Sequence, residues 1–368
     1  MPTATALVDL ENLRHDVDTA LERHLETLAA EVGAVGADAA ALTAQVGALL
    51  QGGKRLRAAF CYWSYRAHGG AGEGSGHDAA VRAGAALELF QAAALLHDDV
   101  MDASDTRRGR PTAHRVFEHR HADAGWSGDP ARFGTAAAIL LGDLCLVACQ
   151  REMASAVRDL PAARAAAARE LFDAMQTEVV VGQYLDVLVQ AEPWGLDPAS
   201  DERRARTVIR AKSARYSVER PLALGALLAG ATPAAVAAVS AAGLPLGEAF
   251  QLRDDELGVF GDPEVTGKPA GDDLREGKRT VLVARTMSGA TPDGRDLLAR
   301  SLGDPGLDAI DVARLRDVIT SSGALAAVED LIAELTGSAL DALDAADLDD
   351  EPRRVLVDLA HAAVQRAA

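Results

Sequence analysis

The chain has 368 residues, of which 49% are hydrophobic, and it carries a formal net charge of −18. This length allows a large buried core, and the negative charge argues against nucleic acid and anionic membrane surfaces as partners. Abundant alanine and few β-branched runs favour an all-α protein.

The cysteines and the N-terminus indicate the compartment. Three cysteines, Cys61, Cys145 and Cys149, are too few for a disulfide framework, which suits a reducing cytoplasm. Cys145 and Cys149 are expected in the core rather than as metal ligands. The N-terminus lacks a basic region followed by an apolar core, and no run of eighteen apolar residues stands out. We therefore expect a soluble cytoplasmic protein without stable membrane insertion.

Apolar residues at helical spacing predict a series of helices in chain order. No linker, low-complexity tract or repeat divides them, so we expect one large helical domain over residues 1–368. Between Thr112 and Phe133 the sequence predicts irregular structure, with the HRH run around Arg120 on the surface. Pro221 and Pro245 are expected to kink their helices. The predicted helices cover 7–31, 38–50, the segment after the Gly52–Gly53 turn up to Ala67, the segment from near His77 to the first acidic run, 134–159, 162–191, 202–229, 232–258 and 276–289, with further helices towards the C-terminus.

The stretch from Phe90 to Thr112 contains the first candidate site. Its apolar first half ends in Asp98, Asp99 and Asp102. On a helix Asp98 and Asp102 share one face, where like charges repel, and the C-terminal end of a helix disfavours anions. This pattern predicts a bound cation, and a solvated acidic turn is the alternative.

Two further stretches carry complementary chemistry. The GGKRLR run, Gly52 to Arg57, places glycines and basic residues before a helix, which fits an anion cradle or a solvated surface turn. A second apolar helix ends in Asp254 and Asp255. Two such helices could face each other across a bundle and hold Mg²⁺, which prefers oxygen ligands and bridges to substrate phosphates. Counter-charge to the phosphoryl oxygens would come from Lys54, Arg57, Arg107, Arg108, Lys212, Lys268 and Lys278.

Taken together, these motifs resemble the trans-isoprenyl diphosphate synthases of the polyprenyl synthetase family, and most of all their bacterial geranylgeranyl diphosphate synthase-like members. The resemblance covers about residues 40 to 290 and implies an all-α fold, a single large antiparallel helix bundle with a central cavity, and a homodimer. The motifs that carry it are GGKRLR, DDVMDASDTRRGRPT, LLGD, VVGQYLD, KSARY and FQLRDDELGVFGDPEVTGKPAGDDLREGKRT.

The resemblance also implies roles at matching positions. Asp98 and Asp102, supported by Asp99, would hold Mg²⁺ on the allylic diphosphate. Asp254, helped by Asp255, would hold a further ion, for about three ions in all. The implied catalytic set is Asp98, Asp99, Asp102, Arg107, Lys212, Asp254 and Lys268. In the implied substrate-binding set, the allylic diphosphate meets Arg107, Lys212, Lys268, Gln183 and Asp186, isopentenyl diphosphate meets Lys54, Arg57, Gln91 and Arg108, and Ser213, Gln251 and Lys278 complete the set.

One position departs from the family pattern. The second motif usually ends in a third aspartate, where this chain has Gly258, and Asp262 is four residues further on as a possible substitute. His97 points about 100° away from Asp98 on the helix, so we do not expect it to be a metal ligand.

The implied function is Mg²⁺-dependent condensation of isopentenyl diphosphate with an allylic diphosphate. Residues below the first motif would set product length: Ala94 and Ala93, which are small, and Phe90, roughly 12 Å from Asp98 along the helix. Because aromatic residues at these alanine positions stop growth at fifteen carbons in the family, we expect geranylgeranyl diphosphate, with twenty-five carbons or more as the alternative. Phe90 is either the floor of the pocket or simply a core residue.

Two other classes of protein remain as alternatives. A terpene cyclase has a hydroxyl ligand in its second metal motif, and this chain has Gly258 at that position. A non-catalytic partner subunit would explain the altered motif but not the complete first one.

Overall fold

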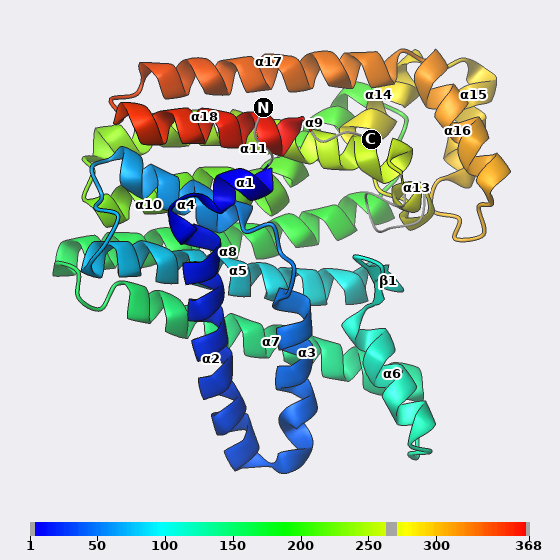
Figure 1. The fold of residues 1–368 in the computed structure, drawn as a ribbon. Helices are drawn as coiled ribbons and strands as arrows, with labels where there is room; N and C mark the ends of the chain where they lie inside the picture. Colours follow the sequence, from blue (N-terminus) through cyan, green and yellow to red (C-terminus); the bar gives the residue numbers. More distant parts are fainter. Residues whose placement is uncertain (1–3, 263–270, 366–368) are drawn as a thin grey trace. The chain divides into compact units, whose positions relative to one another are not determined.

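The computed structural model describes residues 4–262 and 271–365, and it is almost entirely helical (Figure 1), as predicted. One antiparallel hairpin pairs Arg107 with Arg110. The elements are α1 (Ala4–Val8), η1 (Leu10–Asn12), α2 (Leu13–Val35), η2 (Ala37–Ala39), α3 (Ala40–Leu50), α4 (Leu56–Ala67), α5 (Ser75–Met101), β1 (Thr106–Arg107), β2 (Arg110–Pro111), α6 (Ala113–Asp123), α7 (Pro130–Ala156), α8 (Ala162–Ala191), α9 (Pro198–Val208), η3 (Ile209–Glu219), α10 (Arg220–Ala229), α11 (Pro233–Phe260), α13 (Asp272–Glu276), α14 (Val281–Gly289), α15 (Pro292–Ser301), α16 (Ala309–Ser321), α17 (Ala324–Ala345) and α18 (Asp350–Val364).

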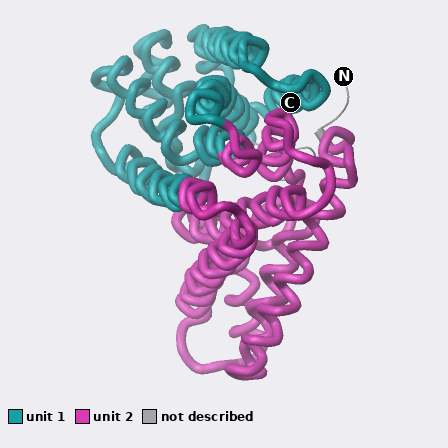
Figure 2. Tube along the Cα trace, turned by 90° about the vertical axis from the view of Figure 1, so that its left-hand side faces the viewer, with its two compact units in different colours: residues 1, 170–223, 232–368 teal, residues 2–169, 224–231 magenta. Residues whose placement is uncertain are grey.

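The chain forms two compact units, shown in different colours in Figure 2. Unit 2 comprises residues 2–169 and 224–231, and unit 1 comprises residues 170–223 and 232–368. The expectation of a single domain stays a prediction. Each unit contains one of the two acidic runs.

In unit 2, α5 is the central helix and packs against α2, α4 and α7. Its alanine-rich sequence is apolar nearly all round, which suits a helix surrounded by others. At Gly84 a side chain would meet Ala58 of α4, so the glycine allows these two helices to approach closely. The helices α2 and α3 form an antiparallel pair, and α6 packs on α7.

In unit 1, the long helix α11 packs against η3, α17 and α18. The helix α14 packs against α9 and α17. Arg253 links α11 to two of these helices. It donates hydrogen bonds to Glu329 of α17, at 2.6 Å, and to the backbone oxygen of Val364 of α18, at 3.1 Å.

Several of the predicted elements are different in the structure. The helix expected over 276–289 begins only at Val281, because Gly277, with a φ of +77°, ends α13 and Thr280 caps the start of α14. The helix expected over 7–31 breaks at η1, where Glu11 and Asn12 have left-handed φ values of +53° and +60°. The segment expected to be irregular contains α6. Its buried stripe includes His114 and His121, seven residues apart, and His121 belongs to the HRH run that was expected on the surface. Histidines count as polar in an apolar pattern, which is why the helix was missed.

Three helices, α5, α7 and α11, are long and apolar enough to cross a membrane by length and composition, although no run of eighteen apolar residues had stood out. In α5, 78% of the most apolar window is buried inside the protein, whereas in α7 the share is 39%. The apolar surface of α7 therefore lacks cover from the described part of this chain.

Candidate active site

The first acidic run lies at the C-terminal end of α5, as predicted. Asp98 and Asp99 are in the last turn of the helix, and Asp102 is its C-cap residue. The side chain of Asp99 is 5% exposed, and that of Asp98 is 19% exposed. Because a helix C-terminus carries partial negative charge, carboxylates there need positive charge nearby. Arg107 supplies some of it, since its Nε donates to Oδ1 of Asp99 at 2.6 Å and its Nη2 lies 3.8 Å from Oδ2 of Asp98.

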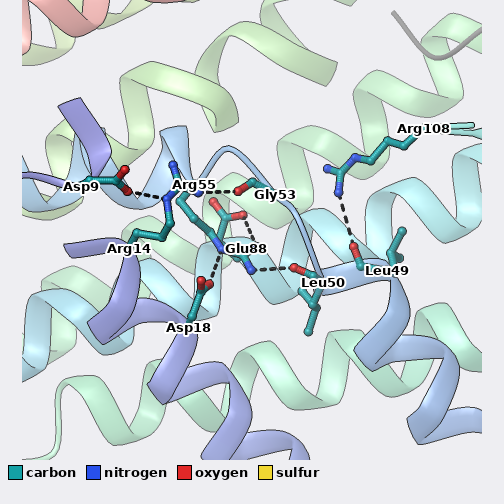
Figure 3. A network of polar contacts seen from close by, with 9 residues as sticks. All are labelled: Asp9, Arg14, Asp18, Leu49, Leu50, Gly53, Arg55, Glu88 and Arg108. Carbon is teal, nitrogen blue, oxygen red and sulfur yellow. Dashed lines mark hydrogen bonds and ion pairs between the residues drawn. The ribbon is translucent and has the colours of Figure 1, made fainter. Parts of the chain in front are cut away.

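The hairpin that follows α5 directs two neighbouring arginines to different places. Its two-residue turn consists of Arg108 and Gly109, with the positive φ values of +53° and +71° that such turns favour. Arg107 points back to the acidic run. The Nη1 of Arg108 instead donates to the backbone oxygen of Leu49, at the end of α3, at 3.4 Å (Figure 3). The hairpin therefore links the acidic run to the end of α3, just before the basic loop, within unit 2.

The basic loop GGKRLR joins α3 to α4. Lys54 is exposed, whereas Arg57 is half-buried. The Nη1 of Arg57 donates to Oε1 of Gln91 on α5 at 2.5 Å. This hydrogen bond brings together two of the residues expected to bind isopentenyl diphosphate.

The basic residues of unit 2 form a repelling cluster. Although Arg108 is exposed as a whole residue, partial burial lowers the pKa of its guanidinium. The buried Glu88 raises this pKa, whereas Arg107, Arg55 and Arg57 lower it further. A bound anion would relieve this repulsion, so the cluster fits a diphosphate.

His97 contacts α7. Its Nε2 lies 3.1 Å from the backbone oxygen of Ile139 and 3.4 Å from Oδ1 of Asp143, both on α7. A side chain at Gly142 would overlap this ring. The LLGD motif thus accommodates His97 and holds α5 against α7.

The residues expected to control product length all lie on α5. Phe90 is 2% exposed and Ala93 is fully buried, whereas Ala94 is half-buried. Ala94 precedes Asp98 by one turn, so it is the one of these three that lies nearest to the acidic run along the helix. The burial of Phe90 fits both of its expected roles, the floor of a pocket and a core residue.

In unit 1, Lys212 lies on a π-helix, η3, which continues α9 and leads into α10. The sequence predicted a continuous helix over this stretch but not its π geometry, which is rare and frequently occurs at functional sites. The Nζ of Lys212 lies 2.6 Å from Oδ2 of Asp186 on α8. This ion pair brings together two residues expected beside the allylic diphosphate.

Two glycines allow neighbouring helices to lie against η3. A side chain at Gly182, in the VVGQYLD motif of α8, would overlap the backbone of Lys212. A side chain at Gly247 of α11 would overlap the backbone of Ala214. The close packing at Gly182 and Gly247 therefore positions the backbone of η3 around Lys212.

The second acidic run lies near the end of α11. Asp255 is buried, and the Nε2 of Gln251 donates to its Oδ1 at 2.8 Å. The pKa of Asp255 is raised to about 8, first by burial and then by the charges of Asp273 and Asp254, against the lowering effects of Gln251 and Lys278.

The side chain of Asp273 occupies the space beside Gly258. A side chain at position 258 would overlap Oδ2 of Asp273. The Nζ of Lys278 lies 3.1 Å from Oδ1 of Asp273 and 2.8 Å from Oε2 of Glu276. A carboxylate from α13 therefore lies where the family pattern would place its third aspartate. The alternative that Asp262 replaces that aspartate stays a prediction.

The donor atoms in both acidic runs fit Mg²⁺, which prefers oxygen ligands. Among residues 4–262 and 271–365, no group of three or more His, Cys, Asp or Glu side chains is arranged to hold a metal. Mg²⁺ commonly takes one or two carboxylates and completes its coordination with water and substrate phosphates. Asp255 and Asp273 repel each other when both are charged, which a cation would relieve. These donors suit an ion that arrives together with a diphosphate.

The remaining predicted site residues have simple placements. Gln183 lies on α8 and Ser213 on η3, both half-buried, and Lys268 lies outside the described residues. Sequence reasoning gave no role to Arg55, Glu88 or Asp273. A lone glutamate in the alanine-rich α5 was the available signal for Glu88.

Comparisons with known proteins agree with these motifs. The polyprenyl synthetase family matches residues 40–319. The geranylgeranyl diphosphate synthase of Sulfolobus acidocaldarius is 31% identical over 268 residues, which cover 73% of each chain. The octaprenyl diphosphate synthase of Escherichia coli is 32% identical over 320 residues, which cover 86% of each chain.

A solved structure of a similar protein also agrees in sequence and fold. Geranylgeranyl pyrophosphate synthase from Corynebacterium glutamicum, complexed with isoprenyl diphosphate and magnesium, is 37% identical, with a TM-score of 0.89. The match covers 98% of this chain and all of that one. The family match extends over more than half of the chain, so the chain belongs to the polyprenyl synthetase family.

Proposed function

We propose that the chain condenses isopentenyl diphosphate with an allylic diphosphate and releases a longer all-trans prenyl diphosphate. Membership of the family makes it a trans-prenyltransferase. The observation that carries the proposal is the split of two neighbouring arginines, Arg107 towards the acidic run and Arg108 towards the end of α3, where the charges of Arg55 and Arg57 act on it. Two diphosphate substrates require two such sets of charges.

We infer that the acidic residues hold divalent metal. Asp98 and Asp102, with Asp99, would hold Mg²⁺ together with the allylic diphosphate, and Asp254 with Asp255 would hold a further ion. Asp273 supports this second set from the space beside Gly258. When bound, the metal would neutralise charge on the leaving diphosphate.

The basic residues account for the remaining steps. The carbon–oxygen bond of the allylic substrate breaks, and its electron pair leaves with the diphosphate, whose charge Arg107 and Lys212 stabilise. Asp186 orients Lys212 for this task. The alkene of isopentenyl diphosphate, held by Lys54, Arg57, Gln91 and Arg108, attacks the allylic carbon. Loss of a proton to the departing diphosphate completes the reaction, so no protein base is required.

For the product we propose geranylgeranyl diphosphate, with twenty-five carbons or more as the second candidate. The small side chains of Ala93 and Ala94 support a product longer than fifteen carbons, with Phe90 as the floor. Similar relatives differ in their product names, geranylgeranyl at 31% identity and octaprenyl at 32%. Residue size on α5 is therefore the better guide.

Three outcomes of one assay separate the candidate functions. Purified protein is incubated with Mg²⁺, isopentenyl diphosphate and farnesyl diphosphate, and the products are separated by chromatography. A longer diphosphate supports the proposal, and excess EDTA should abolish its formation. A hydrocarbon or alcohol would indicate a terpene cyclase, and the absence of turnover would indicate a non-catalytic partner subunit.

We also infer a homodimer in the cytoplasm. Phe133, Leu140 and Val147 recur at intervals of seven residues on α7 and are 37%, 61% and 53% exposed. Seven residues are close to two helical turns, so these side chains form one apolar stripe that a second copy of the chain would cover. The three cysteines are buried in the protein, which supports a reducing compartment.

A further inference from the structure

Arg55, the middle cation of the GGKRLR loop, points into the protein rather than to solvent. It is 6% exposed and has a left-handed φ of +54°. Its Nε donates to Oδ1 of Asp18 on α2 at 2.8 Å, and its Nη2 donates to the backbone oxygen of Leu50 at 2.6 Å (Figure 3). Its Nη1 lies 3.3 Å from Oε2 of Glu88 on α5. One guanidinium thus ties the loop to three helices of unit 2.

The loop backbone is held at a second point by Arg14 of α2. The Nη1 of Arg14 donates to the backbone oxygen of Gly53 at 2.9 Å, and its Nε pairs with Asp9 at 2.6 Å. A side chain at Gly53 would overlap Nη1 of Arg55, so this glycine leaves room for the guanidinium. The backbone between Leu50 and Arg55 is therefore fixed before any ligand binds.

The inward direction of Arg55 determines where its neighbours point. Lys54 is exposed, and Arg57 reaches Gln91 on α5. The positions of Lys54 and Arg57, which are expected to meet isopentenyl diphosphate, therefore depend on the buried Arg55 between them. A buried arginine with three charged or carbonyl partners is costly to replace, because its partners would be left unpaired.

Glu88 supplies the fixed negative charge of this cluster. It is 5% exposed, and its Oε1 has no hydrogen-bond partner in the described part of the chain. Its charge also acts on Arg108, whose guanidinium it stabilises against the surrounding arginines. Removing the charge of Glu88 would leave the basic residues to repel one another and move apart.

We propose that Arg55 and Glu88 are positioning residues, which hold the loop so that Lys54 and Arg57 are preset for the diphosphate of isopentenyl diphosphate. This inference rests on the proposed function and extends it to residues that do not touch the substrate. A preset loop lowers the entropic cost of binding that substrate. Binding of the allylic substrate depends on Arg107 and the acidic run, so a change in the loop should alter its affinity little.

The test compares Arg55→Met, Arg55→Lys and Glu88→Gln with Arg82→Met. Arg82 of α5 is the control, because like Arg55 it pairs with a buried glutamate, Glu152, at 3.0 Å, but it lies away from the loop. The dissociation constant of isopentenyl diphosphate is measured by calorimetry without the allylic substrate. Steady-state KM values for both substrates and thermal unfolding midpoints complete the set.

In Arg55→Met we expect the dissociation constant and the KM of isopentenyl diphosphate to rise by about tenfold or more. The KM of the allylic substrate and kcat should change by no more than about twofold. Arg55→Lys should recover part of the loss, and Arg82→Met should leave both KM values unchanged. Glu88→Gln keeps the shape of the side chain and should selectively weaken the binding of isopentenyl diphosphate. This variant tests the proposal if Arg55→Met does not fold.

Two results would overturn the proposal: a folded Arg55→Met or Glu88→Gln with unchanged affinity for isopentenyl diphosphate, or equal losses for both substrates. Wild-type protein that binds isopentenyl diphosphate but elongates no primer would refute the proposed function instead. The calorimetric comparison of the variants would still report on Arg55.

Discussion

Gly258 and Asp273 share one space in unit 1, since any side chain at position 258 would overlap Oδ2 of Asp273. The sequence alone presents Gly258 as a lost carboxylate. In the folded chain a carboxylate is present at that place, contributed by α13 and held by Lys278 at 3.1 Å.

Restoring the family's aspartate should therefore harm this protein. We expect Gly258→Asp to destabilise the fold by about 1–3 kcal/mol, because the added side chain overfills the space and brings a further negative charge beside Asp273. Urea unfolding measures the loss. Combining it with Asp273→Gly should recover most of the stability. An unchanged unfolding midpoint in Gly258→Asp alone would contradict the shared space.

A methyl group at Gly182 should displace Lys212. Gly182→Ala places a carbon against the backbone of η3, so we expect a loss of about 1–3 kcal/mol and a higher KM for the allylic substrate. The control is Gly337→Ala on α17, where no heavy atom lies within 4 Å of the new carbon. That change should stabilise the protein by about 0.5–1 kcal/mol. Equal effects of the two substitutions would contradict the close approach of α8 and η3.

Glu178 should make unit 1 sensitive to acid. Burial by itself raises the pKa of Glu178, but hydrogen bonds and attraction from Arg220 and Arg215 outweigh it and hold the pKa below the ordinary 4.5. A carboxyl group whose pKa is lowered in the folded state stabilises the fold at any pH above its ordinary pKa of 4.5. This contribution disappears as the pH falls from 4.5 through the lower pKa of the folded state. Glu178→Gln should lower the unfolding midpoint at pH 7 and flatten its decline below pH about 4.5. Parallel pH profiles for the two proteins would refute the link.

Phe90 should limit the length of the product. We expect Phe90→Ala to shift the main product beyond twenty carbons, because it removes the proposed floor. Leu89→Ala is the control, since Leu89 is equally buried but points about 100° away. Product chromatography after dephosphorylation gives the distribution. If both variants make the wild-type product, Phe90 is a core residue and not the floor.

The apolar stripe on α7 should mediate self-association. Leu140→Glu places a charge in the centre of a surface that a second copy would bury, so the protein should become monomeric in sedimentation. Ile310→Glu on α16 is the control, because Ile310 is 62% exposed against 61% for Leu140. A dimer that survives Leu140→Glu would place the interface elsewhere.

The helices and the first acidic run could be predicted from the sequence because they depend on local patterns. Apolar spacing located α5, α8 and α11 closely, and the position of Asp98 at a helix end followed from it. Arg57 and Gln91, expected from two separate stretches to meet the same substrate, are joined by a hydrogen bond.

The remaining features depend on contacts between distant segments. The sequence could not show that Asp273 lies against Gly258, fifteen positions earlier, or that Arg55, the middle cation of GGKRLR, turns inward to Glu88. The helix α6 was missed because two of its core positions are histidines. The apolar spacing of residues 202–229 predicted a helix but did not distinguish the π geometry of η3 from an ordinary α-helix.

That π geometry governs how this protein tolerates changes in chain length. A π-helix accommodates more residues per turn than an α-helix, so losing one residue between Ile209 and Glu219 would allow ordinary α-helical winding. Each residue turns an α-helix by about 100°, so Lys212 would rotate away from Asp186 rather than simply shift along the axis. A single-codon deletion at this place would thus alter the direction of a functional amine while leaving the composition and length of the helix almost untouched.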